Sequence, residues 1–186
     1  MADVYEITSK ASIDVDDFSR AVGDGRKSLA FSPENALLLL PLANVEVQLG
    51  LLNAASLDAR DALEYLDRFA GPAAFSNEVW SELTMKLNAS SHFVLGRAAI
   101  TKALRLQGPA RLTLLTESES ELALALPDEN TKAAYLLGLA KLASGQSKQA
   151  ASEFLAASRS TSNVRTPAFQ SAQDFVWLPP AVCPDS

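Results

Sequence analysis

The chain has 186 residues, of which 48% are hydrophobic and 20% charged, and its formal net charge is -6. This length allows one domain with a substantial core and does not require two. Phosphate groups bind clustered lysine and arginine, and this acidic sequence contains no such cluster. The composition therefore argues against nucleic acid and against an anionic membrane surface as partners.

The first residues carry no recognisable targeting signal. Residues 1–10 have neither a basic start nor an apolar stretch, so we expect a cytoplasmic protein, or a periplasmic or secreted one if a signal has been removed. The longest apolar run, residues 36–43, includes Pro41 and is far shorter than the roughly 20 residues that span a membrane, so we expect it in the core. Cys183 is the only cysteine and cannot form an internal disulfide.

Alanine and leucine dominate the sequence while β-branched residues are few, which predicts helices along most of the chain. Ser32, Pro33 and Glu34 have the order typical of a helix start: a capping hydroxyl, a proline in the first turn and a carboxylate at the positive end of the helix dipole. Residues 70–77 are expected to form a loop. The predicted helices, with boundaries good to about 2–4 residues, cover residues 14–31, 34–55, 57–70, 77–106 (with a possible break near 87–88), 109–126, 130–144 and 147–158.

The C-terminal segment beyond residue 158 has a weaker pattern. Thr166 and Pro167 could cap and open a short helix over 167–177, with Phe169 on its apolar stripe. We expect this helix to cover the outer face of the last predicted hairpin, because a stack of hairpins otherwise leaves that face in water. Residues 179–186 are expected to form a tail.

Residues 131–158 place small side chains where two helices of a hairpin would cross. This spacing resembles the tetratricopeptide repeat (TPR), a helix-turn-helix unit of 34 residues. With Thr131 as repeat position 1, Ala134 and Lys141 depart from the family pattern, which prefers Trp and Tyr at those places. The residues that agree with the pattern, at repeat positions 7, 8, 15, 20, 24 and 27, are Leu137, Gly138, Gly145, Ala150, Phe154 and Ala157.

The same resemblance extends to earlier segments. The pairs Leu49-Gly50 and Leu95-Gly96 match Leu137-Gly138 and predict two further repeats, with spacings longer than the standard 34 residues. Residues 28–35 are similar to the end of a TPR second helix, with Ser and Phe substituted. The resemblance implies an all-α, TPR-like superhelical stack of helical hairpins, with expanded repeats and a C-terminal capping segment, forming one domain over residues 1–178.

In TPR proteins the first helices of successive repeats line a concave groove, mainly through repeat positions 2, 5, 9 and 12. The resemblance therefore implies a groove that binds a peptide with apolar anchors. For Phe93 and Tyr135, packing between repeats is an equally good interpretation. The Asn of the family's carboxylate clamp is missing at repeat position 6. The candidate groove residues are Asn44, Val47, Leu51, Ser90, Phe93, Arg97, Lys132, Tyr135, Leu139 and Leu142.

Candidate chemical sites are weak. His92 is the only histidine, so we expect it to pack at an interface rather than to bind a metal or serve in a catalytic triad. The acidic residues 14–17 fail the calcium-loop pattern, which needs Gly and Glu where Ser19 and Gly25 stand, and are expected to open a helix. Residues 116–121 (TESESE) are expected to form a solvated face. We predict no metal, no cofactor and no enzymatic activity.

Two functions from different classes follow. The first is a non-catalytic adaptor that holds a protein or peptide segment in its groove. The second is a self-assembly module, in which exposed apolar edges pair two copies. An enzyme is the weakest alternative, because no mixed cluster of titratable groups is visible.

Overall fold

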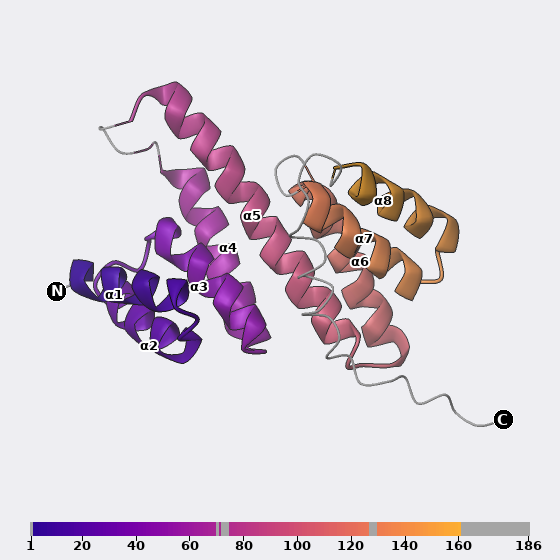
Figure 1. Ribbon diagram of the computed structural model, residues 1–186, viewed down its shortest axis with the longest axis horizontal. Helices are drawn as coiled ribbons and strands as arrows, with labels where there is room; N and C mark the ends of the chain where they lie inside the picture. Colours follow the sequence, from indigo (N-terminus) through magenta and orange to yellow (C-terminus); the bar gives the residue numbers. More distant parts are fainter. Residues whose placement is uncertain (1, 70, 72–74, 127–129, 161–186) are drawn as a thin grey trace.

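The computed structural model describes residues 2–69, 71, 75–126 and 130–160. This part of the chain is built from helices and contains no strand (Figure 1), as the sequence predicts. The predicted capping helix over 167–177 and the tail over 179–186 lie outside the described residues. The helices are α1 (Ala2–Asp14), α2 (Phe18–Leu29), α3 (Ala36–Gln48), α4 (Leu52–Arg68), α5 (Asn77–Ala103), α6 (Gly108–Ala125), α7 (Asn130–Ala143) and α8 (Ser147–Ser160).

The helices form four hairpins that stack in chain order: α1 with α2, α3 with α4, α5 with α6 and α7 with α8. Between hairpins, the second helix of one contacts the first helix of the next, as α2 contacts α3, α4 contacts α5 and α6 contacts α7. In Figure 1, α1–α4 lie to one side of the long α5 and α6–α8 lie to the other. The arrangement is a TPR-like stack of helical hairpins.

Residues with positive φ mark the turns inside three of the hairpins. Asp16 (φ 58°), Gly50 (φ 76°) and Gly145 (φ 82°) each lie just before the second helix of their hairpin. Asp16 and Gly50 are 34 positions apart, which is the length of the standard TPR unit. The first two hairpins therefore have the ordinary spacing, and the expansion lies in α5 and α6, which have 27 and 18 residues.

The turn at Gly50 corrects two of the predictions. Gly50 is a turn residue and not part of a close helix crossing, so the single helix predicted over 34–55 is divided into α3 and α4. In the α3–α4 hairpin, Ala43 has the repeat position that Gly138 has in the α7–α8 hairpin, and Ala43 is fully buried. Helix α1 was not predicted at all, and α5 runs without a break through residues 87–88.

Missing Cβ atoms allow the helices to cross closely. A Cβ added at Gly138 would lie 2.7 Å from the ring of Phe154 on α8, and one added at Gly96 would lie 2.5 Å from Cγ of Leu122 on α6. Both distances are below those that real Cβ atoms make, so a larger residue would force the helices apart. The predicted register of α7 and α8 is confirmed by this contact.

Candidate interaction surface

The first helices α3, α5 and α7 follow one another along the stack, with contacts from α3 to α5 and from α5 to α7. With Gly50 at the turn, Ala36 becomes repeat position 1 of the α3 hairpin, and the groove positions in α3 shift accordingly. We define the first-helix stripe as repeat positions 2, 5, 9 and 12 of these three helices. Its residues are Leu37, Leu40, Asn44, Val47, Ser90, Phe93, Arg97, Ile100, Lys132, Tyr135, Leu139 and Leu142.

Nine of the ten predicted groove residues lie on this stripe. The exception is Leu51, which is the N-cap residue of α4 and lies in the turn beyond α3, so it cannot line a groove formed by first helices. Three residues of the stripe were missed: Ile100 at repeat position 12 of α5, and Leu37 and Leu40 on α3. Leu37 and Leu40 were missed because reading Gly50 as a crossing residue placed the start of the repeat at Ala43. A turn signal at Gly50 could have found them.

Burial divides the stripe into core and surface. Val47 and Phe93 are only 6% and 8% exposed and belong to the core between hairpins. The ring of Tyr135 lies 5.7 Å from that of Phe154, so it packs against α8. Among the large apolar residues of the stripe, Leu37 (45%) and Leu142 (50%) are the exposed ones. Contact with a ligand stays a prediction for every residue of the stripe.

Two open hollows lie away from the stripe. One, of about 390 Å³, lies where α4 ends and α5 begins, and its aromatic wall consists of Phe69 and Trp80, whose rings meet edge to face at 5.6 Å. The hydroxyl of Thr84 in its lining is buried without a hydrogen-bond partner. The other, of about 330 Å³, lies near Gly50 and includes Lys102 and Arg105. Neither hollow was predicted from the sequence.

An ion cluster with two buried carboxylates joins the first two hairpins. Arg26 on α2 donates to Glu46 on α3 at 2.5 Å and to Asp58 on α4 at 2.8 Å. Burial, together with the neighbouring negative charge of Asp58, raises the pKa of Glu46 to about 7. Burial likewise raises the pKa of Asp58.

The two carboxylates of this ion cluster are closed to ligands, because the side chains of Glu46 and Asp58 are only 1% and 4% exposed. Paired carboxylates can perform acid–base chemistry only where a substrate can reach them. The cluster therefore ties helices together. The sequence signal that could have found it is Glu46 itself, an isolated charge between Val45 and Val47.

The sequence predicted that the TESESE run, residues 116–121, forms a solvated face, and this prediction is wrong. Each of its carboxylates binds a different helix or turn. Glu117 pairs with Arg60 on α4 at 3.1 Å, and Glu121 lies 2.7 Å from Nδ1 of His92 on α5. Glu119 accepts hydrogen bonds from Ser144 and Gln146, around the α7–α8 turn. The prediction that His92 packs at an interface is confirmed.

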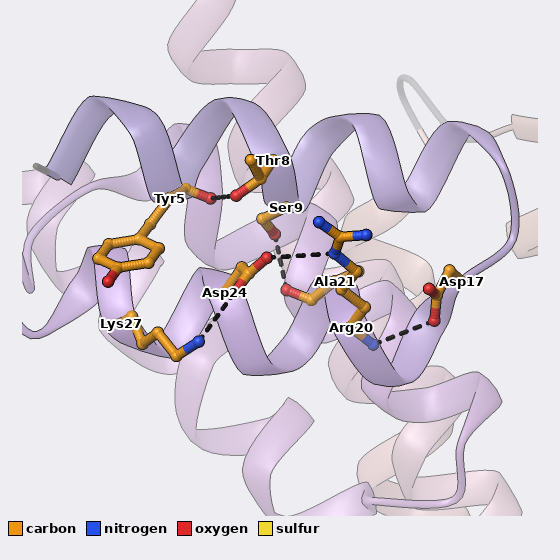
Figure 2. Close-up of polar contacts among 8 residues, drawn as sticks. All are labelled: Tyr5, Thr8, Ser9, Asp17, Arg20, Ala21, Asp24 and Lys27. Atoms are coloured by element: carbon orange, nitrogen blue, oxygen red, sulfur yellow. Dashed lines mark hydrogen bonds and ion pairs between the residues drawn. The ribbon is translucent and has the colours of Figure 1, made fainter.

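The acidic residues before α2 serve the first hairpin, as Figure 2 shows. Asp17 is the N-cap of α2 and accepts a hydrogen bond from the amide of Arg20, so this acid opens a helix as predicted. Asp14 instead ends α1 and Asp16 lies in the turn, so the helix predicted from residue 14 begins at Phe18. Ser9 on α1 donates to the carbonyl of Ala21 at 2.7 Å, so the two helices lie close together. A hydrogen bond from Lys27 lowers the pKa of Asp24.

Among the described residues, no group of three or more His, Cys, Asp or Glu side chains could hold a metal ion. None of the described helices is both long and apolar enough to cross a bilayer.

Comparisons with known proteins add little to this description. No family model matches the chain, and no curated protein matches it significantly. Among solved structures, the chain is similar to one described as the crystal structure of MamA protein, with 15% identity and a TM-score of 0.34. The match covers 89% of this chain and 96% of that one. At this TM-score the fold assignment rests on the helix pairing and the turns described above.

Proposed function

We propose that this protein is a non-catalytic interaction module that holds a peptide or protein segment against its first-helix stripe. The observation that carries this proposal is the stripe on α7, where Leu142 is 50% exposed and Leu139 is half-buried on the same side of the helix. Exposed leucine beside half-buried apolar groups offers an anchor point for a partner's apolar side chain.

The charge of the stripe favours one kind of partner. Arg97 on α5 is half-buried and Lys132 on α7 is exposed, and the stripe carries no acidic residue. A segment with apolar anchors and neighbouring carboxylates would complement it.

A role as an interaction module also agrees with the state of the titratable groups. The groups that would attract attention as catalytic candidates, Glu46, Asp58 and the Glu121–His92 pair, each bind another helix of the stack. Groups used in this way hold the hairpins together and leave the exposed surface for binding.

The experiment is a selection from a random peptide library displayed on phage, with the full chain as bait. Affinities of the enriched peptides are then measured for wild type, for Leu142→Glu, and for Leu124→Glu as a matched control. Leu124 is 54% exposed on the second helix α6, so both substitutions alter a similarly exposed leucine.

We expect acidic peptides with apolar anchors, and a loss of affinity of about tenfold or more for Leu142→Glu alone, typical of an interface anchor. Circular dichroism should show that both variants remain folded. Peptides that bind the two variants equally well would locate binding elsewhere, and failure to enrich any peptide would contradict the proposal.

A further inference from the structure

Helix α1 exposes an apolar face at the beginning of the stack. Val4 and Ile7 are 57% and 66% exposed, and Ala11, one helical turn further, is exposed as well. The three residues lie on one side of α1, since they are three and four positions apart. We call them the leading face.

The equivalent residues of other first helices are covered by the preceding hairpin. Val4, Ile7 and Ala11 lie 12, 9 and 5 positions before Asp16, the turn residue with positive φ. Counting back the same distances from the turn residues Gly50 and Gly145 gives the equivalent residues of α3 and α7. In α3, Leu38 shares a core cluster with Leu29 of α2. In α7, Leu136 shares one with Leu122 of α6. Five of the six equivalent residues are 3% exposed or less and Pro41 is half-buried; the six are Leu38, Pro41, Val45, Ala133, Leu136 and Ala140.

The opposite end of the stack has the complementary surface. On α8 the exposed residues Ala151, Leu155 (57%) and Ser158 form what we call the trailing face. The residues at the same distances after the turn in α2 are Val22, Arg26 and Leu29. These pack against α3 or bind Glu46 of that helix, so the trailing face occupies the side on which a next first helix would lie.

We propose that the trailing face of one copy packs against the leading face of a second copy, which joins the chains head to tail. The new contact would repeat the one that α2 makes with α3 and α6 makes with α7. The occupant is therefore a second copy of this chain, because contacts of this kind already join successive hairpins within one copy. The proposal does not depend on peptide binding at the first-helix stripe.

Charge complementarity supports the same occupant. Successive helices are antiparallel, because Gly25 of α2 faces Leu42 of α3 while Leu29 shares a cluster with Leu38. In that orientation the start of α8, with exposed Lys148, meets the end of α1, with exposed Asp14. This pair has opposite charge, which favours this orientation over one that joins α1 to α1.

A contact of this kind uses different surfaces on the two copies. Such heterologous interfaces continue into open chains unless the rotation closes a ring. Blocking either face should therefore stop growth. Mixing two chains that are blocked at different faces should restore one contact and no more.

The test is light scattering coupled to size exclusion on the full chain over a range of concentrations. The variants are Ile7→Glu, which blocks the leading face, Leu155→Glu, which blocks the trailing face, and Leu124→Glu as a control at similar exposure. Val4→Glu and Ala151→Glu are second variants of the two faces, and circular dichroism checks folding.

We expect the mass of wild type and of Leu124→Glu to rise with concentration, and Ile7→Glu and Leu155→Glu each to stay at the mass of one chain. An equal mixture of Ile7→Glu and Leu155→Glu should reach the mass of two chains and stop there. A wild type that stays monomeric would overturn the proposal and favour residues 161–186 as the cover of α8. Assembly that survives Leu155→Glu would replace it with a symmetric contact between copies of α1.

Discussion

At the scale of single residues, one absent Cβ sets how closely α7 and α8 approach. A Cβ at residue 138 would lie 2.7 Å from Cε1 and 2.9 Å from Cδ1 of Phe154. We expect Gly138→Ala to overpack this crossing and to lower the free energy of unfolding by about 1–3 kcal/mol, measured by urea denaturation. Gly23→Ala is the control: it lies inside α2 with no atom within 4 Å of its added Cβ, and should raise stability by about 0.5–1 kcal/mol. Equal effects at the two positions would contradict this account.

Glu46 gives the protein a defined dependence on pH. Its pKa is about 7 in the folded protein, above its ordinary value of 4.5. Between these values the folded state holds a proton that the unfolded state has lost, so this group lowers stability as the pH rises from about 4.5 to about 7, with little further change above that. The Glu46→Gln variant keeps the shape without the charge. We expect it to exceed wild type in unfolding free energy by about 1–3 kcal/mol at pH 8 and by much less at pH 5. Parallel stability curves for the two proteins would exclude this role for Glu46.

At the scale of elements, the turns of the first two hairpins use different residues for one conformation. Asp16 has φ 58° and Gly50 has φ 76°, a region that costs a residue with a Cβ more than it costs glycine. We therefore expect Asp16→Gly to stabilise the protein and Gly50→Ala to destabilise it, each by about 0.5–1 kcal/mol, in thermal unfolding followed by circular dichroism. Shifts of the melting temperature in the same direction would show that the positive φ does not decide how these two substitutions affect stability.

The same elements show how far the sequence alone could predict the fold. Helix content and the α7–α8 register were predictable, because Gly138, Gly145 and Phe154 fix a crossing and a turn within one short segment. The α3–α4 turn was not, because a Leu-Gly pair suits both a close crossing, as at Gly96, and a turn, as at Gly50. Helix α1 was missed although Val4, Ile7 and Ala11 have the spacing of one helical face.

The candidate site, like the fold, was predictable from the sequence only in part. The stripe on α5 and α7 followed from the repeat pattern, since it depends only on spacing within one helix. The partners of charged residues did not, because Glu117 and Glu119 find their partners 57 and 25 positions away, on other hairpins. Such distances along the chain are set by stacking, and no local pattern encodes them.

At the scale of the whole molecule, each hairpin is stabilised by its neighbours, so the hairpins at the ends can open separately. Arg26 is the side chain through which α2 binds the buried Glu46 and Asp58 of the next hairpin. Replacing it with methionine keeps much of its length but leaves two buried carboxylates without their cation, which costs several kcal/mol in comparable sites. When α1 and α2 open, this cost is released, because the carboxylates meet water. We therefore expect Arg26→Met to speed amide hydrogen exchange in α1 and α2 by at least tenfold, with little change in α7 and α8, measured by mass spectrometry on the full chain. Arg60→Met is the matched control, since it breaks an exposed pair with Glu117 that is worth about 1 kcal/mol or less. Acceleration of similar size in all four hairpins would mean that the stack opens as one unit and that Arg26 does not couple its first hairpin specifically.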